Sequence, residues 1–156
     1  MSQGLFTRQI VVVIPTYNEA GNIEKVLNGV RAALPQARLL VVDDDSPDGT
    51  GDIVERYQSS HQTDGLGEVS VLHRSAKAGL GAAYRAGFTT ALSMGAEICV
   101  QMDADLSHDP MYLPAIVSAV EMGADVALGS RYTPGGQIDN WPLLRRFLSR
   151  WGNRFA

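Results

Sequence analysis

Short apolar runs and longer amphipathic segments alternate along the chain. The short runs are rich in β-branched residues, as is typical of strands buried on both faces, and they cover residues 9–14, 38–43, 69–73, 97–102 and 125–129. The segments between them carry apolar residues at helical spacing, and they run from 22 to 34, from 53 onward, from 80 to 94 and from 110 to 122. These repeated strand–helix–strand units predict an α/β fold in which a mainly parallel sheet is sandwiched by helices.

Residues with special backbone preferences mark the ends of these elements. Pro15 cannot donate to a central ladder, so we expect the first strand to leave the sheet there. Asn22 is a favourable helix N-cap, and Asp109 followed by Pro110 is a cap with proline at the first helical position. After a loop at 133–140, a last helix begins at 142 and reaches the end of the sequence. We therefore expect one domain, residues 1–156, that is a fragment of a longer protein.

The charge is distributed unevenly, although 45% hydrophobic and 19% charged residues make an ordinary soluble composition. Residues 1–140 hold all 17 acidic residues and nine of the 13 basic ones, a net charge of −8, whereas residues 141–156 hold four arginines and no acid. The acidic body argues against nucleic-acid binding. No run approaches the roughly 18 apolar residues of a membrane span.

Carboxylates directly follow two of the predicted strands. Asp44 follows the run at 38–43, and Asp103 and Asp105 follow the run that ends at 102. Ligands of open α/β sheets bind outside the carboxyl ends of the strands, and two carboxylates there can hold a divalent cation that bridges to substrate phosphates. The alternative is an ordinary set of turn and cap residues. Because acids cluster at both strand ends, the pattern favours a phosphorylated, nucleotide-linked substrate bound through a metal.

The loop after the first strand offers a second recognition element. Tyr17 presents a flat face for a base and Glu19 can accept from base or ribose, although the same residues also suit a plain strand-to-helix loop. No G-x-G-x-x-G follows this strand and no G-x-x-x-x-G-K-[ST] occurs, which argues against a dinucleotide fold and a P-loop NTPase. The glycines in the stretch 77–81 are explained equally well by a tight helix start.

Four segments together resemble the family-2 inverting glycosyltransferases, which have the GT-A fold. They are VIPTYNE at 13–19, VDDDSPDGT at 42–50, MDADLSH at 102–108 and GSRY at 129–132. The last three are more specifically similar to the polyprenyl (dolichyl) phosphate mannosyltransferase subgroup. The resemblance covers nearly the whole chain, and it implies a Rossmann-like catalytic domain that is incomplete at its C-terminus.

The resemblance also implies a role for each matching residue. At the guanosine of GDP-mannose it places Pro15, Tyr17, Glu19, Val42 and Asp44. At the diphosphate it places Asp103, Ala104, Asp105 and Arg131. The metal ligands would be Asp103 and Asp105, and the catalytic residues these two and Arg131. The acceptor phosphate would meet Arg131, Arg145 and Ser149.

The activity that the resemblance implies is transfer of mannose from GDP-mannose to a polyprenyl phosphate, with inversion and with Mg²⁺ or Mn²⁺ as cofactor. It places the enzyme in the cytoplasm, peripheral on the cytosolic face of a membrane, where a membrane-anchoring domain or subunit could hold it. Two alternatives stay open. The same fold could use another nucleotide sugar, as a polyprenyl-phosphate glucosyltransferase does, or the chain could be an inactive nucleotide-sugar-binding fragment.

The predicted last helix carries an apolar stripe beside a basic one. The apolar residues are Leu144, Phe147, Leu148, Trp151 and Phe155, and the basic ones are Arg146, Arg150 and Arg154. Such a helix can pack on a core with a solvated basic face. Aromatic residues and arginines without an acid also suit an anionic membrane surface, which we favour because a polyprenyl phosphate stays in the bilayer.

Overall fold

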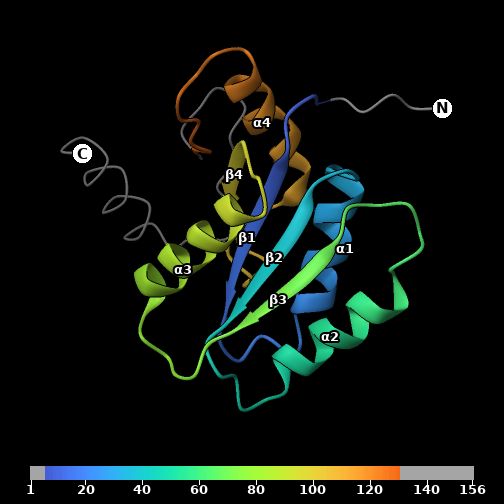
Figure 1. The fold of residues 1–156 in the computed structure, drawn as a ribbon, viewed down its shortest axis with the longest axis vertical. Coiled ribbons are helices and arrows are strands. Elements are labelled where there is room, and N and C mark those ends of the chain that lie inside the picture. The colour runs from blue at the N-terminus through green and yellow to red at the C-terminus, as the bar shows by residue number, and fades with distance from the viewer. Residues whose placement is uncertain (1–5, 131–156) are drawn as a thin grey trace, which may run out of the picture.

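Four parallel strands form a sheet in the order β3-β2-β1-β4 in the computed structural model, which describes residues 6–130 (Figure 1). The strands are β1 (Ile10–Thr16), β2 (Arg38–Asp43), β3 (Val69–His73) and β4 (Ile98–Gln101). Thr16 is level with Asp43 on β2, and Val13 is level with Gln101 on β4. The mainly parallel sheet expected from the sequence is therefore confirmed.

Helices cover both faces of this sheet, as predicted (Figure 1). They are α1 (Ile23–Ala33), α2 (Thr50–Ser60), α3 (Leu80–Ser93) and α4 (Leu113–Glu121), the last preceded by the 3₁₀ turn η1 (Pro110–Tyr112). Helices α1, α2 and α4 pack on one face and α3 packs on the other. Among the described residues, no helix is both long enough and apolar enough to cross a membrane.

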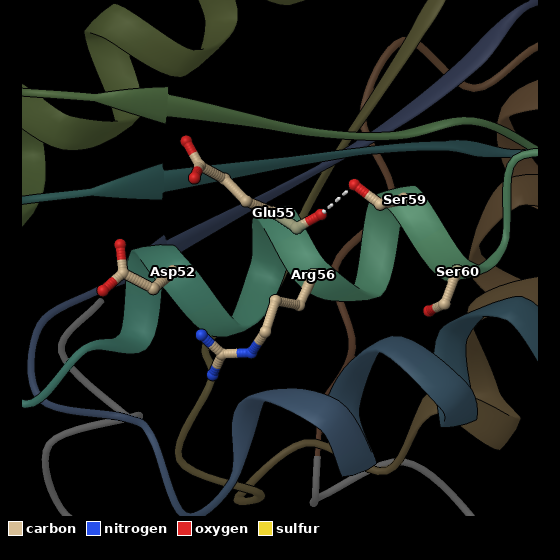
Figure 2. A pocket seen from close by; sticks show the side chains of 5 residues that line it. All are labelled: Asp52, Glu55, Arg56, Ser59 and Ser60. Atoms are coloured by element: carbon tan, nitrogen blue, oxygen red, sulfur yellow. Dashed lines mark hydrogen bonds between the residues drawn. The ribbon is translucent and has the colours of Figure 1, made fainter.

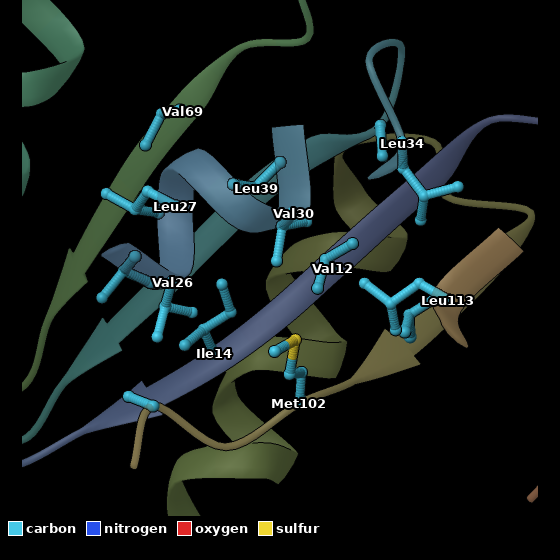
Figure 3. Packing of buried hydrophobic residues seen from close by; sticks show 14 of the residues in the cluster. Val12, Ile14, Val26, Leu27, Val30, Leu34, Leu39, Val69, Met102 and Leu113 are labelled. Carbon is cyan, nitrogen blue, oxygen red and sulfur yellow. The ribbon is translucent and has the colours of Figure 1, made fainter. Parts of the chain in front are cut away.

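The alternation of side chains along β1 creates the two cores. All seven residues of β1 are buried, with Val12 and Ile14 in the larger core beneath α1 and Val11 and Val13 in the smaller core beneath α3. Figure 3 shows the larger core, which also takes in Val26, Val30, Leu39, Met102 and Leu113. Because β1 is buried on both faces, it forms a rigid centre for the loops that leave its carboxyl end.

Helix α3 lies unusually close to the sheet. A Cβ on Gly87 would come within 2.4 Å of Val13 Cγ1 and 2.9 Å of Val42 Cγ2, so only glycine fits at this contact. The neighbouring helical residues Ala83 and Ala91 are small and buried. This tight packing fixes the height of α3 above the carboxyl end of the sheet.

One expected strand is absent from the described residues, and the end of another lies further along the chain than expected. Residues 125–129 form no strand in the described structure, and Val126 and Leu128 are 73% and 85% exposed, because a strand requires a hydrogen-bonded neighbour that this apolar run lacks there. Pro15 remains inside β1, level with Val42. Val13 O accepts from Met102 N on the β4 side, so the nitrogen of Pro15 faces the space beyond the end of β4 and costs the sheet no hydrogen bond.

Of the two predicted helix caps, Asp109 makes the expected hydrogen bond and Asn22 does not. Asp109 accepts from Met111 N at 3.0 Å and so caps η1 as predicted. Asn22 stands at the N-cap position of α1 but makes no capping bond; its amide donates instead to Glu19 Oε2 at 2.8 Å. The predicted loop at 133–140 and the helix from 142 lie outside the described residues.

Candidate functional site

The strand order places a topological switch point between β1 and β4. From β1 the chain winds outward through β2 to β3, and then crosses to the opposite side of β1 to form β4 (Figure 1). Where connections leave in opposite directions, open α/β sheets bind their ligands at the carboxyl ends of the two central strands. We call this edge of the sheet, between the ends of β1 and β4, the crevice. The segments at this crevice are the loop after β1 and the loop after β4, and both contain predicted site residues.

Asp103 lies at the β4 side of the crevice. It follows the end of β4 by two residues, its side chain is 37% exposed, and its Oδ1 accepts a hydrogen bond from the Tyr84 hydroxyl at 2.6 Å. Its Oδ2 lies 4.0 Å from His108 Nδ1. Burial, and then the hydrogen bond to Asp103, raise the pKa of Tyr84, so the phenol stays protonated and donates. One oxygen of Asp103 is thus fixed from inside the protein.

Asp105 is exposed beside it. Its Oδ1 accepts from the backbone N–H of Ser107 at 2.9 Å, and hydrogen bonds from the side chain and the backbone of Ser107 lower the pKa of Asp105. The carboxylate is therefore ionised at neutral pH. Two carboxylates at positions i and i+2 of one loop therefore lie near the switch point, on the β4 side of the crevice.

Asp44 lies on the other side of β1, at the end of β2. Because β2 and β4 both neighbour β1, Asp44 and Asp103 are separated by about two strand spacings, roughly 10 Å. Asp44 is 4% exposed, and its Oδ1 accepts from Arg74 Nη1 at 2.5 Å. Arg74 directly follows β3, so three parallel strand ends contribute charged groups to one edge of the sheet.

Tyr17 and Glu19 lie in the loop after β1, as predicted, but both already have partners. Lys77 Nζ lies 3.7 Å from the centroid of the Tyr17 ring and covers one of its faces. Glu19 Oε2 accepts from Asn22. A base could therefore stack only on the other face of Tyr17, or on this face once Lys77 moves.

The turn at 46–50 holds this loop in place. Asp48 Oδ2 accepts from Ala20 N at 2.9 Å, while its Oδ1 accepts from Thr50 N and Thr50 Oγ1. Thr50 Oγ1 accepts from Glu19 N, and Ser46 Oγ accepts from Asn18 N. The conspicuous SPDGT segment thus acts here through hydrogen bonds to the loop after β1.

Backbone strain is concentrated at the same edge. Within residues 6–130, three residues other than glycine have a positive φ, and each is 60°: Asn18, Asp45 and Leu106. They follow β1, β2 and β4 respectively. Leucine tolerates this region poorly, and such a residue costs about 1–3 kcal/mol, which persists where the surrounding structure fixes it, often at functional sites.

Three predicted site residues are buried and contribute to the frame of the crevice. Pro15 lies within β1, Val42 packs against α3, and Ala104 is 3% exposed between the two aspartates. Their side chains are buried in this structure, as that of Asp44 is. The predictions for Arg131, Arg145 and Ser149 lie outside the described residues.

The residues present suit a cation that is shared with a substrate. Within residues 6–130, no three His, Cys, Asp or Glu side chains gather as a metal site. Asp103 and Asp105 lie two positions apart on one loop, and they are half-buried and exposed respectively, so both carboxylates can be reached from outside. Mg²⁺ and similar cations are commonly held by one or two carboxylates together with substrate phosphates and water. The pair fits that arrangement and does not fit a closed structural metal centre.

A shallow surface depression elsewhere does not compete with this crevice. It is lined by five polar residues, all on α2: Asp52, Glu55, Arg56, Ser59 and Ser60. Figure 2 shows that Glu55 and Arg56 point away from each other and that Ser59 Oγ is used within the helix, where it donates to Glu55 O. The groups do not converge on one point, so the depression has no arrangement for chemistry.

Three residues at the site were not predicted to be there. Arg74 could have been found, since it directly follows a predicted strand just as Asp44 does. Lys77 belongs to the glycine-rich stretch 77–81, whose pattern does not predict a contact with Tyr17. Tyr84 gave no signal, because a tyrosine on a helix rich in alanine and glycine reads as a core residue.

Comparisons with known proteins agree with this geometry. The family model for glycosyl transferase family 2 matches residues 11–156. The chain is 47% identical over 150 residues to polyprenol monophosphomannose synthase of Mycolicibacterium smegmatis, covering 96% of this chain and 55% of that protein. It is 38% identical over 144 residues to dolichol-phosphate mannosyltransferase of Pyrococcus furiosus, covering 91% and 38%. The chain thus spans about half or less of the length of these relatives.

Solved structures show the same fold. A mannosyltransferase from Pyrobaculum calidifontis, solved in complex with GDP-Man and Mn²⁺, superposes with a TM-score of 0.57 at 29% identity, over 72% of this chain and 32% of that one. Glucosyl-3-phosphoglycerate synthase from Mycobacterium tuberculosis has a TM-score of 0.50 at 24% identity, over 72% and 39%. The sheet, its switch point and these likenesses identify the GT-A fold. The chain belongs to glycosyl transferase family 2.

Proposed function

We propose that this chain carries the donor-binding part of an enzyme that transfers mannose from GDP-mannose to a polyprenyl phosphate. The observation that carries the proposal is the carboxyl edge of the sheet, where Asp44 lies on one side of β1 and Asp103 and Asp105 on the other. A nucleotide sugar bound across β1 would have its nucleoside near Asp44 and its diphosphate near the aspartate pair. The names of the relatives, which are mannosyltransferases and synthases for polyprenol, undecaprenyl or dolichol phosphates, support the acceptor class.

The charges at this edge match the needs of the reaction. An oxygen of the acceptor phosphate forms a bond to C1 of the sugar, and the C1–O bond to the diphosphate breaks, so that its electron pair leaves with GDP. No proton has to be removed, because the acceptor is already an anion at neutral pH. A bound Mg²⁺ or Mn²⁺ would offset the negative charge that develops on the leaving diphosphate.

A single displacement of this kind inverts the sugar carbon and gives a β-linked product from an α-linked donor. Asp103 and Asp105 serve the diphosphate of the donor through the cation. The acceptor phosphate needs positively charged side chains that hold it in line with the sugar carbon. We propose Arg131 and Arg145, together with Ser149, for that part. The acceptor is a membrane lipid, so we also propose that the enzyme works in the cytoplasm, peripheral on the cytosolic membrane face, with an anchoring domain or subunit as an additional means of attachment.

The nucleotide preference tests the donor assignment. We expect GDP to bind more tightly than UDP or ADP in the presence of Mn²⁺, because Tyr17, Glu19 and Asp44 are proposed to contact guanosine. A competition titration against one labelled nucleotide would give the three affinities under identical conditions. Equal affinity for GDP and UDP would contradict GDP-mannose as the donor, and tighter binding of UDP would favour a glucosyltransferase.

A further inference from the structure

On the side of α3 that faces the sheet, the hydroxyl of Tyr84 lies beside Asp103 of the aspartate pair. Tyr84 is only 6% exposed, and its hydroxyl donates to Asp103 Oδ1 at 2.6 Å. A buried tyrosine hydroxyl requires a hydrogen-bond partner. Its partner here is one of the two strand-end carboxylates of the candidate site, which brings a helix from the smaller core into contact with the site.

The position of this hydroxyl is set by packing. Gly87, one turn further along α3, lies directly against Val13 and Val42, so the helix cannot move closer to the sheet. Ala83 beside Tyr84 is buried in the same core. The Tyr84 ring also stacks on Phe88, with ring centroids 5.7 Å apart. The hydroxyl therefore stands at a defined point above the end of β4.

We propose that Tyr84 is a positioning residue that orients the Asp103 carboxylate for the metal and the diphosphate. By holding Oδ1 from the buried side, the phenol turns Oδ2 outward, toward the side where His108 lies. This inference rests on the proposed function, because it assigns Asp103 to the donor. Carboxylates that ligate metals are themselves commonly hydrogen-bonded, and removal of such a partner typically costs 10- to 100-fold in metal affinity or activity.

The substitution Tyr84→Phe tests the proposal, because it removes the hydroxyl and keeps the ring. Calorimetric titration of GDP should show binding that is about tenfold or more weaker than wild type with Mn²⁺ present. With EDTA instead of Mn²⁺, the two proteins should bind GDP equally. A purely structural role for Tyr84 would not produce a difference that depends on the metal, and thermal unfolding would report any loss of stability separately.

Tyr57→Phe is a matched control. Tyr57 is also 6% exposed, and its hydroxyl donates to Asn28 Oδ1 at 2.7 Å in the larger core, on the opposite face of the sheet. We expect this variant to lose stability without any change in the effect of Mn²⁺ on GDP binding. The proposal is overturned if Tyr84→Phe binds GDP and Mn²⁺ like wild type, or if both variants weaken this binding equally.

The wild-type titration separates this inference from the proposed function. If GDP binds wild-type protein more tightly with Mn²⁺ and Tyr84→Phe leaves that gain intact, the proposed donor site stands and the role of Tyr84 is refuted. If wild-type GDP binding does not respond to Mn²⁺, the shared-cation site itself is refuted and the role of Tyr84 with it.

Discussion

Replacing Asp105 with alanine is expected to abolish detectable mannosyl transfer while the fold persists. Asp105 is exposed at the crevice, and its low pKa keeps it ionised. Its removal leaves Asp103 as the one remaining carboxylate of the pair. The cation then loses one of its two proposed protein ligands, and the diphosphate is held less firmly through the cation. The expected loss is several kcal/mol of transition-state stabilisation, a rate decrease on the order of 100-fold or more. A transfer assay at saturating GDP-mannose measures it.

Asp125→Ala provides the matched comparison. Asp125 is also exposed, and it lies after α4 rather than at the switch point. We expect transfer to be unchanged in this variant, and circular dichroism should show the same fold for both. Wild-type activity in Asp105→Ala, or wild-type transfer that survives excess EDTA, would contradict the assignment of the pair to a metal and a diphosphate.

Asp44→Ala is expected to weaken GDP binding by about 1–3 kcal/mol, or roughly 5- to 150-fold. In the proposed site Asp44 accepts a hydrogen bond from the nucleoside, so its loss removes that acceptor. Because Asp44 is buried and paired with Arg74, the substitution also leaves Arg74 without its carboxylate partner. Isothermal titration of GDP in the presence of Mn²⁺ measures the effect directly. The affinity for Mn²⁺ alone should change little, since Asp44 lies on the other side of β1 from the aspartate pair.

Asp64→Ala is the control for this substitution. Asp64 also pairs with an arginine, since its Oδ1 accepts from Arg31 Nη2 at 2.7 Å, but it lies in the loop before β3, at the opposite edge of the sheet. Because Arg31 is buried, this variant should unfold more easily and still bind GDP with wild-type affinity. Equal affinity loss in both variants would mean that Asp44 acts through stability alone.

Periodicity was sufficient to predict most of this fold. Runs of β-branched residues located β1 to β4 within two residues at each end, and the rule that parallel strands gather their carboxyl ends at one edge brought Asp44, Asp103 and Asp105 to the same region. The prediction failed for residues 125–129, where the apolar pattern is present but no hydrogen-bonded neighbour occurs within residues 6–130. The apolar pattern indicates that a segment favours the extended conformation, whereas a β-strand also requires a neighbouring strand to which it can hydrogen-bond.

The contacts that shape the site could not be read from the chain in advance. Tyr84 and Asp103 are 19 residues apart, and their hydrogen bond depends on how closely Gly87 lets α3 approach the sheet. Asp48 lies in a sequence that is typical of a turn, yet its carboxylate also accepts a hydrogen bond from the backbone of Ala20 in another loop. Such contacts depend on the distance between elements, which local sequence does not encode.

The most direct test of the central claim is a transfer assay with the full chain, GDP-mannose labelled in the sugar, and a polyprenyl phosphate in vesicles. Labelled mannose should enter the lipid fraction with Mn²⁺ or Mg²⁺, and EDTA should stop the transfer. Labelled UDP-glucose should give no labelled lipid. Label that stays in the aqueous fraction in the presence of metal, or glucose that transfers in preference to mannose, would contradict transfer of mannose from GDP-mannose to a polyprenyl phosphate.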